Sequence, residues 1–389
     1  MPKVLVLRQS SIYLGLERML LEVGSSVMQR NPTWQIDLLL LMTRRGLTPG
    51  QLATLPARHA LLGEAWARGL TAWQWDDAGK IAPRQWVQLL YFVRSQGYDI
   101  VHTQEHKSNF LGALLQRWSG VRIVATLHGY PQAYRRMQLY RRIDRHVLRR
   151  FDHVVAVSEA LRRELIAGGV RPERLSTVHN GIDIHAFRAQ VSDLPALPQT
   201  VGGPVVTTVA RLSAEKGIEY LLESAAMLRA RFPAARFVIV GEGPLRSHLE
   251  AQANRLGLIN AQVVSFLGHR HDVASLMAQS DVVILPSLRD GCPMVLIEAL
   301  ALGRPVVASW VDGIPEIVED GVSGLLVPPG DSRALAAAIE RLLVDRELAT
   351  TLARQGMRRV EETFDVAAMA ERTLAVYQQV LERPPRHAP

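Results

Sequence analysis

The sequence of 389 residues contains a single cysteine, Cys292, and no long uninterrupted apolar run. One cysteine excludes an intrachain disulfide framework, which is typical of proteins from a reducing compartment. The longest apolar run, residues 36–42, is interrupted by Asp37 and is far shorter than the roughly 20 residues that a membrane-spanning helix requires. The N-terminal segment has a short apolar stretch without a small-residue cleavage site, so it predicts a β-strand and not a signal peptide. We therefore expect a cytoplasmic protein.

Internal repeats, low-complexity segments and recognised RNA- or DNA-binding modules are also missing from the sequence. The basic residues therefore do not indicate a nucleic-acid partner. The length exceeds that of a usual single domain, and 48% hydrophobic with 21% charged residues supply apolar material for two globular cores. We expect two domains.

The net charge of +8 is unevenly distributed along the chain. Residues 1–190 hold 26 Lys and Arg against 14 Asp and Glu, whereas residues 191–389 hold 19 against 23. Much of the excess lies in residues 134–150, where apolar side chains recur at helical spacing between arginines. This segment is either a solvated surface helix or a surface for anionic lipid headgroups or a phosphorylated acceptor. The second interpretation predicts a peripheral position on the inner face of the cell membrane.

Short β-like apolar runs alternate with amphipathic helical runs through both halves, which predicts two parallel sheets covered by helices. The expected strands are residues 3–7, 35–42, 100–102, 123–127, 154–157, 205–209, 237–240, 263–267, 282–285, 306–308 and 325–327. Residues 191–204 are rich in Pro, Gly and small polar side chains and predict a linker. We expect an N-terminal domain over residues 1–195, a C-terminal domain over residues 196–365, and a helix at about 366–382 that can pack back on the first.

Doubly wound sheets bind ligands at the carboxyl ends of their strands. Two such domains facing each other would bind a donor molecule on one side of an interdomain cleft and an acceptor on the other. Closure of the domains would exclude water from the reacting centre.

The block from Asp290 to Glu298 has the most informative order of residues. An apolar run, residues 281–286, predicts a buried strand, and a Gly/Pro turn and a helical run follow it. The first N–H groups of a helix lack partners, and the helix dipole favours negative charge there. This order therefore predicts an anion site, with the candidate residues Gly291, Cys292, Pro293, Met294, Val295 and Leu296.

Two cations, Arg211 and Lys216, lie in one expected strand-to-helix loop, residues 209–217. They are either surface cations or the opposite wall of the same anion site, and the downstream block favours the second interpretation. A departing nucleoside diphosphate gathers negative charge in the transition state, so preorganised cations beside it lower the barrier. The two segments together suit a diphosphate.

Three side chains of the Asp290–Glu298 block are candidates for further roles. Glu298 falls in the first turns of the expected helix and can accept hydrogen bonds from a ribose diol. Asp290 can receive sugar hydroxyls, cap the helix, or do both. Cys292 has no neighbouring base to activate it as a nucleophile, so we expect a small apolar filler.

Three further strand ends carry Gly-rich turns or histidines. Gly241 follows the run 237–240, but Arg246 stands where a dinucleotide fingerprint needs its third glycine, which disfavours a dehydrogenase. His269 follows residues 263–267, in a loop whose backbone can meet a base. His128 ends a strand on a Gly turn and is expected to face the cleft.

Taken together, these motifs closely resemble the large retaining glycosyltransferase family 4, whose members have the GT-B fold of two facing Rossmann-like domains. The matching motifs cover most of the chain: residues 128–129, 157–159, 180–183, 211, 216–217, 241–244, 281–308, 312–316 and 321–328. The resemblance implies that Arg211 and Lys216 hold the donor diphosphate and that Glu298 holds the ribose. It also implies that backbone N–H groups near residues 294–296 bind phosphate or sugar, and that His128 helps to position the transferred sugar.

Three positions depart from the family pattern. Asp290 stands where a glutamate usually opens the Glu-x7-Glu signature, which shortens the carboxylate by one methylene and can alter donor choice. The glycine-rich first loop is reduced to residues 14–17, in which Gly15 can still allow close approach to a phosphate. Gln104 replaces a frequent second histidine, so the acceptor base near it stays unassigned.

The resemblance predicts a retaining glycosyltransferase that moves a sugar from a UDP- or GDP-sugar to a glycan or lipid-linked acceptor, in cell-surface polysaccharide or glycolipid biosynthesis. No Asp-x-Asp motif ends a strand, so we expect no metal and no cofactor, with Arg211 and Lys216 replacing a divalent ion. Two alternatives stay open: a nucleotide-sugar epimerase of the same fold, which needs no acceptor, and a non-catalytic relative that binds a nucleotide-sugar without transfer.

Overall fold

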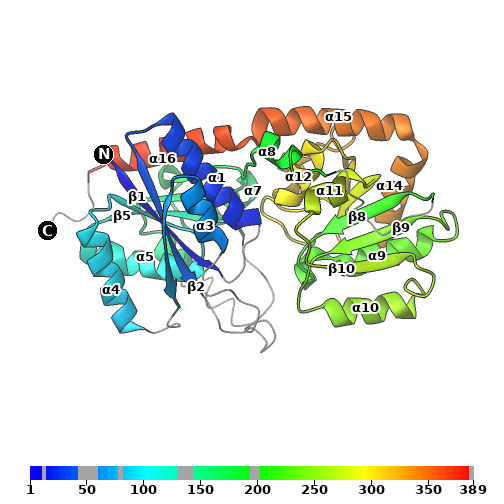
Figure 1. Ribbon diagram of the computed structural model, residues 1–389, viewed down its shortest axis with the longest axis horizontal. Coiled ribbons are helices and arrows are strands. Elements are labelled where there is room, and N and C mark those ends of the chain that lie inside the picture. The colour runs from blue at the N-terminus through cyan, green and yellow to red at the C-terminus, as the bar shows by residue number, and fades with distance from the viewer. Residues whose placement is uncertain (11–14, 43–59, 78–81, 130–143, 193–201, 385–389) are drawn as a thin grey trace. The chain divides into compact units, whose positions relative to one another are not determined.

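The computed structural model describes residues 1–10, 15–42, 60–77, 82–129, 144–192 and 202–384 (Figure 1). The chain divides into two compact units. Unit 1 takes the described residues up to Gly181 and again from Val366, and unit 2 takes Ile182–Asp365. Among the described helices, none is long and apolar enough to cross a membrane.

Unit 1 contains a seven-stranded sheet in which every neighbouring pair is parallel. The strand order β3-β2-β1-β4-β5-β6-β7 reverses direction between β1 and β4, as in doubly wound folds. The strands are β1 (Lys3–Ser10), β2 (Gln35–Met42), β3 (Thr71–Asp76), β4 (Ile100–Thr103), β5 (Arg122–Leu127), β6 (His153–Ala156) and β7 (Leu175–Thr177).

Helices cover the sheet of unit 1, and the last helix of the chain is one of them (Figure 1). They are α1 (Gly15–Arg30), α3 (Ala60–Ala67), α4 (Pro83–Ser95), α5 (His106–Ser119), α7 (Glu159–Ala167) and α16 (Val366–Glu382), with the short η1 (Pro172–Arg174). Helix α16 packs on α1, where Tyr377 stacks on Trp34 with ring centroids 6.0 Å apart. The helix that follows unit 2 in sequence therefore completes the core of unit 1.

Unit 2 contains a six-stranded sheet, again parallel throughout, with the order β10-β9-β8-β11-β12-β13. The sequence order of the strands reverses between β8 and β11, while the strands stay parallel. The strands are β8 (Val205–Val209), β9 (Arg236–Val240), β10 (Val264–Gly268), β11 (Val282–Leu285), β12 (Val306–Ser309) and β13 (Leu325–Val327).

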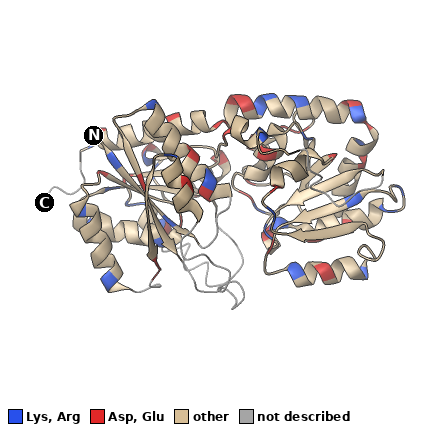
Figure 2. Cartoon of the chain, in the orientation of Figure 1, with Lys and Arg blue, Asp and Glu red and all other residues tan. Residues whose placement is uncertain are grey.

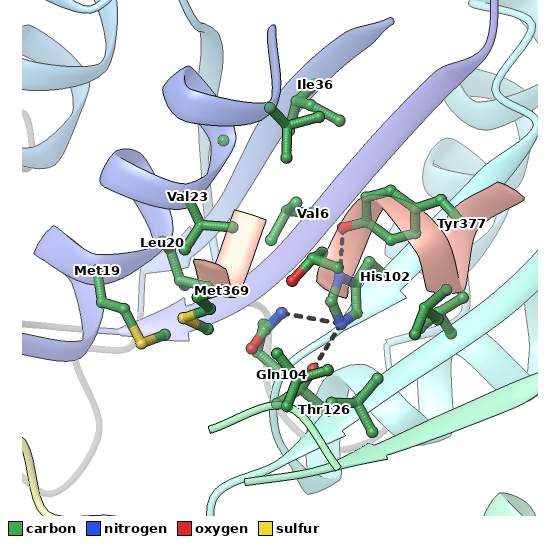
Figure 3. A pocket seen from close by; sticks show the side chains of 17 residues that line it. Val6, Met19, Leu20, Val23, Ile36, His102, Gln104, Thr126, Met369 and Tyr377 are labelled. Carbon is green, nitrogen blue, oxygen red and sulfur yellow. Dashed lines mark hydrogen bonds between the residues drawn. The ribbon is translucent and has the colours of Figure 1, made fainter. Parts of the chain in front are cut away.

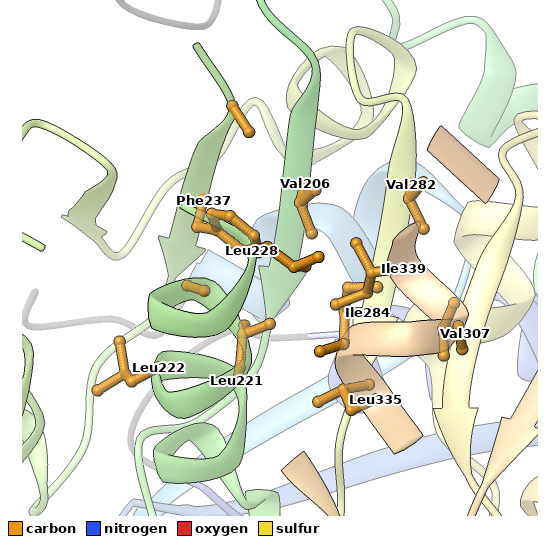
Figure 4. Packing of buried hydrophobic residues seen from close by; sticks show 14 of the residues in the cluster. Val206, Leu221, Leu222, Leu228, Phe237, Val282, Ile284, Val307, Leu335 and Ile339 are labelled. Atoms are coloured by element: carbon orange, nitrogen blue, oxygen red, sulfur yellow. The ribbon is translucent and has the colours of Figure 1, made fainter. Parts of the chain in front are cut away.

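The core of unit 2 forms where helices bury their apolar faces on this sheet. Figure 4 shows Leu221 of α9 (Ile218–Leu228) with Leu335 and Ile339 of α14 (Ser332–Val344), packed against Ile284 of β11. Each of these side chains is at most 1% exposed, so their burial contributes the main stabilising free energy. The remaining helices are α8 (Ile184–Arg188), η2 (Ala214–Lys216), α10 (Arg246–Arg255), α11 (Val273–Ala278), α12 (Met294–Ala301), α13 (Ile314–Ile317) and α15 (Arg346–Thr363).

The boundary between the units differs from the expected division near residue 195. It falls between Gly181 and Ile182, because the segment after Gly181 is bonded to unit 2. The N–H of Ile182 donates to the carbonyl of Phe364 at 3.0 Å, and Arg188 Nε donates to the carbonyl of Ala301 at 2.7 Å. The expected fold class, two parallel-sheet α/β domains, is confirmed.

Candidate active site

The candidate donor site lies at the point in unit 2 where the strand order reverses. Strands β8 and β11 are neighbours there and run parallel, so the loops that follow them leave the same edge of the sheet. Arg211 and Lys216 lie in the loop after β8, and Asp290 lies in the loop after β11. Ligands of doubly wound sheets bind at this position.

The two cations of the loop after β8, Lys216 and Arg211, differ in their burial and in their carboxylate partner. Lys216 Nζ donates to Asp290 Oδ2 at 2.6 Å, and both side chains are largely buried. Arg211 is 62% exposed and contacts Glu215 at 2.5 Å. Burial would raise the pKa of Glu215, but hydrogen bonds from Ser213 and Arg211 lower it below its ordinary value. Glu215 is therefore a stable carboxylate that orients Arg211.

Gly217 lets the loop after β8 approach the loop after β11 closely. Gly217 has φ +61°, and a Cβ on it would lie 2.1 Å from the carbonyl oxygen of Pro286. The backbone N–H of Leu288 donates to the carbonyl of Glu215 at 2.8 Å. The loop after β8 thus packs directly on the backbone of the loop after β11, and a larger residue at 217 cannot fit without moving it.

Asp290 is fixed from its backbone side. Its N–H donates to Asp312 Oδ2 at 2.9 Å, and Arg289 Nε donates to the same oxygen at 2.6 Å. Asp312 adopts φ +43°, a conformation that Asp tolerates better than most residues. The sequence marks Asp312 through the Asp312-Gly313 pair, which is a turn signal, but carries no local signal for its contact with Asp290.

The helix after this loop, α12, begins at Met294 with Pro293 as its N-cap and without a side-chain cap. Asp290 is therefore not the cap of α12, and its carboxylate pairs with Lys216 instead. The N–H of Leu296 donates to the carbonyl of Pro293 at 3.2 Å. The expected anion site at the start of this helix stays a prediction.

Two other side chains of the block are buried. Cys292 is 5% exposed and Glu298 is 8% exposed. Gly291 lies in the turn that separates Asp290 from α12. Burial of Cys292 is compatible with a small apolar filler, and the ribose role of Glu298 stays a prediction.

The turn after β9 closes on the first loop. Gly241 has φ +133°, and a Cβ there would lie 2.0 Å from the carbonyl oxygen of Ala210. The N–H of Gly241 donates to the carbonyl of Gly268 at 2.8 Å, so the turns after β8, β9 and β10 form one backbone-packed edge. His269 follows on this edge, and burial together with His271 lowers its pKa.

His128 and Gly15 belong to unit 1. His128 follows β5, and its Nε2 lies 3.1 Å from Gln104 Oε1. Burial, Arg8 and His102 lower the pKa of His128 to about 3, so the ring is neutral at pH 7. Gly15 begins α1, and a Cβ on it would meet no described atom within 4 Å.

The basic segment 134–150 lies partly outside the described residues. In its described part, Arg145 pairs with Glu164 at 3.3 Å, and Arg149 Nη2 donates to the carbonyl of Gly168 at 2.7 Å. These two arginines therefore also serve the packing of unit 1.

The charged residues of two other helices are distributed differently. Figure 2 shows basic residues on α4 without acidic ones, whereas α15 carries both basic and acidic residues.

The described residues contain no group of three or more His, Cys, Asp or Glu arranged to hold a metal ion.

Comparison with known proteins places this geometry in a family. One family model, Glycosyltransferase Family 4, matches residues 45–186, and another, Glycosyl transferases group 1, matches residues 203–345. Alpha-D-kanosaminyltransferase from Streptomyces kanamyceticus is 29% identical over 70% of this chain and 74% of that protein. The putative colanic acid biosynthesis glycosyltransferase WcaL from Escherichia coli is 32% identical over 60% of this chain, which spans 58% of that protein.

Solved structures show the same architecture. HepE from Anabaena, crystallised with UDP and glucose, superposes with a TM-score of 0.82 over 97% of this chain and 100% of that chain, at 26% identity. Sucrose-phosphate synthase from Thermosynechococcus elongatus shares the fold with a TM-score of 0.75 at 23% identity. With a family model matching each half and relatives named as glycosyltransferases, the chain belongs to the family 4 (group 1) glycosyltransferases and is a transferase enzyme of the GT-B fold.

Proposed function

We propose that this glycosyltransferase moves a sugar from a UDP- or GDP-sugar to a glycan or lipid-linked acceptor with retention at the anomeric carbon, without a metal ion or cofactor. The observation that carries the proposal is the set of charges at the β8–β11 edge. Lys216, Arg211 and the N-terminus of α12 lie on adjacent loops there. Two cations and a helix N-terminus match a diphosphate in charge.

The names and complexes of relatives support the substrate class. HepE binds UDP and glucose, and UDP-glucose in a second complex. A relative from Escherichia coli, 27% identical over 67% of this chain, is named as a galactosyltransferase acting on a diphosphoundecaprenol-linked sugar. WcaL is named for colanic acid biosynthesis. These names favour a UDP-sugar and a role in cell-surface polysaccharide or glycolipid biosynthesis.

The Lys216–Asp290 pair supplies the first step of the proposed mechanism. Without a donor, the ammonium and the carboxylate neutralise each other at 2.6 Å. A diphosphate brings more negative charge than one carboxylate, so it competes for Lys216 and leaves Asp290 to accept hydrogen bonds from sugar hydroxyls. Lys216 then stabilises the charge that grows on the leaving diphosphate in the transition state.

Retention in this proposal does not use a covalent glycosyl intermediate. A double-displacement mechanism needs a carboxylate nucleophile with a second carboxyl group about 5 Å away as acid and base. In this proposal Asp290 accepts hydrogen bonds from sugar hydroxyls, and Glu298 is buried within α12. The acceptor therefore attacks on the face that the diphosphate leaves, assisted by that diphosphate.

The proposed lack of a metal requirement has a direct test. Transfer rates measured with excess chelator should equal those measured with Mg²⁺ or Mn²⁺, because fixed cations replace the divalent ion. A rate that collapses with chelator and returns with one added metal contradicts the proposal.

The proposed position is peripheral, on the inner face of the cell membrane, through residues 134–150. Flotation with anionic and neutral liposomes tests this step. Recovery from anionic liposomes only, reduced by added salt, is expected because the attraction is electrostatic. Equal recovery from both kinds of liposome removes the idea.

The decisive experiment is a thermal-shift panel of nucleotide sugars followed by product analysis. A true donor should raise the melting temperature strongly, because it binds only the folded state. Incubation of that donor with a panel of glycans and lipid-linked sugars should give a glycosylated product with retained configuration. Conversion of the donor to an isomer without acceptor would identify an epimerase instead.

A further inference from the structure

A chain of buried hydrogen bonds crosses unit 1 from α16 to the end of β5. Figure 3 shows its part from Tyr377 through His102 to Gln104. Tyr377 Oη lies 2.7 Å from His102 Nδ1, and His102 Nε2 lies 3.2 Å from Gln104 Nε2. Gln104 Oε1 lies 3.1 Å from His128 Nε2. Thr126 Oγ1 makes a side contact of 2.7 Å to His102 Nε2. Gln104 thus bridges the two histidines.

A carboxamide that bridges two neutral imidazoles must donate to one ring and accept from the other. It offers a donor at its nitrogen and an acceptor at its oxygen. One histidine must therefore accept at Nε2 while the other donates from Nε2. This conclusion holds for either orientation of the Gln104 amide, so His102 and His128 must be opposite tautomers.

The unpartnered atoms select between the two orientations. His128 Nδ1 is buried and has no hydrogen-bond partner among the described residues. A buried N–H without an acceptor costs more than a bare lone pair, so Nδ1 carries no proton and Nε2 donates to Gln104 Oε1. The Thr126 hydroxyl and the Gln104 amide then share the single lone pair of His102 Nε2 in a three-centre bond, with the Thr126 contact the shorter one, and His102 donates from Nδ1 to Tyr377.

The remaining donor, the Tyr377 hydroxyl, lines a small cavity. The cavity has a volume of about 30 Å³, enough for one water molecule. Its apolar wall comes from α1, β1 and α16, including Met19, Val23 and Met369, and its polar end is formed by His102, Gln104, Thr126 and Tyr377 (Figure 3). A water there can accept the Tyr377 proton, which satisfies every donor of the chain in this orientation.

Both rings are neutral at physiological pH, as the two-tautomer argument requires. Burial and His153 lower the pKa of His102 to about 3. Burial, Arg8 and His102 lower the pKa of His128 to the same range.

We propose that Gln104 is a positioning residue that holds the proton of His128 on Nε2, so that His128 is a neutral ring whose buried Nδ1 carries no proton. The proposal rests on the proposed glycosyltransferase function for its catalytic consequence. His128 then has no proton on Nδ1 to give to a sugar or a leaving group, and it acts through its fixed position at the end of β5.

Histidine tautomers can be measured directly, independently of activity. The protein, with ¹⁵N-labelled histidine, would be studied by long-range ¹H–¹⁵N correlation at pH 8, with His102→Gln and His128→Gln variants to assign the signals. We expect the proton on Nε2 of His128 and on Nδ1 of His102. The same tautomer at both rings, or a proton on Nδ1 of His128, overturns the proposal whether or not any nucleotide sugar is turned over.

Two variants test the role of Gln104. Gln104→Glu presents only acceptors, so His102 should change to the Nε2–H tautomer while His128 keeps its own. Gln104→Met removes both bonds, so His128 should sample both tautomers, and kcat for donor hydrolysis should fall about tenfold, the effect of losing one hydrogen bond to a polar site, with KM little changed. A tautomer pattern that neither variant alters contradicts the positioning role.

A matched control separates this effect from a general loss of packing. Gln85 is also a buried glutamine of unit 1, 6% exposed, and its Nε2 donates to the carbonyl of Asp76 at 2.7 Å. Gln85→Met should lower the melting temperature without changing the His128 tautomer or kcat. If Gln85→Met lowers kcat as much as Gln104→Met, the effect is structural and the proposal fails.

Discussion

Replacing Gly217 with alanine should separate the two loops that carry Lys216 and Asp290. The new Cβ would lie 2.1 Å from the carbonyl oxygen of Pro286, whereas ordinary contacts between such atoms are about 3.5 Å. The two loops must therefore move apart by roughly 1 Å. The backbone offers no alternative, because the clash is with a carbonyl and not with the end of a flexible side chain.

The loss of stability follows from two local terms, and the loss of rate follows from the displacement of the loops. Alanine at φ +61° costs about 1–2 kcal/mol relative to glycine. Loss of the Leu288 N–H to Glu215 carbonyl bond, now 2.8 Å, adds about 1 kcal/mol. We expect unit 2 to lose about 2–3 kcal/mol of stability. A misplacement of 1 Å at reacting groups can cost about 100-fold in rate, so transfer should fall by about that factor.

The assay compares Gly217→Ala with Gly321→Ala. Gly321 has φ +71°, but a Cβ on it would meet nothing within 4 Å, so this variant carries the backbone strain without the clash. Thermal unfolding and kcat with saturating donor are measured for both. Gly321→Ala should lose about 1 kcal/mol and keep its kcat. Equal kcat values for the two variants would refute the assigned contact between the loops.

Three further results are expected. Lys216→Ala should reduce kcat at saturating donor about 100-fold or more, as for removal of one preorganised charge-stabilising group; near-normal turnover would exclude its role at the diphosphate. Asp290→Glu lengthens the carboxylate that contacts Lys216, so the order of kcat/KM values among nucleotide sugars should change, and an unchanged order would show that this residue does not select the donor. Burial lowers the pKa values of His102, His128 and His153 to about 3, 3 and 4. In the unfolded chain these histidines have their ordinary pKa of about 6.5, so below that pH the unfolded chain binds more protons than the folded one. The free energy of unfolding therefore falls as pH falls from 7 to 4. The melting temperature should drop over that range with a smaller slope in His153→Gln, whereas a flat profile would contradict the neutral buried state.

The central strands could be predicted from the sequence because each is a short apolar run. Two edge strands were missed for a physical reason. Strand β3 (Thr71–Asp76) alternates tryptophan with polar residues, and β7 (Leu175–Thr177) has three residues, two of them polar. Their hydrogen bonds to β2 and β6 define them as strands, and a local pattern carries little information about pairing at an edge.

The domain boundary was misplaced because the composition marks a linker and not the contacts of the chain around it. Residues 191–204 are rich in Pro and Gly, but the preceding segment already belongs to unit 2. The bridge between Ile182 and Asp365 joins residues far apart in sequence. Such pairing has no local signal.

The site was predictable in its location and less so in its contacts. Parallel strands place Arg211, Lys216 and Asp290 at one sheet edge, which the order of motifs is enough to predict. The Lys216–Asp290 pair spans 74 positions, and the bond between His102 and Tyr377 spans 275. Both depend on how distant segments pack, so Gln104 was recognised as a substitution but not as a bridge.

The return of α16 to unit 1 has a consequence for the order of folding during synthesis. A nascent chain that has emerged through Gly181 lacks Met369 and Tyr377, which line the cavity and polar chain of unit 1. Unit 2 is continuous in sequence and can fold while unit 1 is still incomplete, although domains usually complete in order from the N-terminus. The N-terminal half therefore cannot complete its apolar core until α16 has been synthesised.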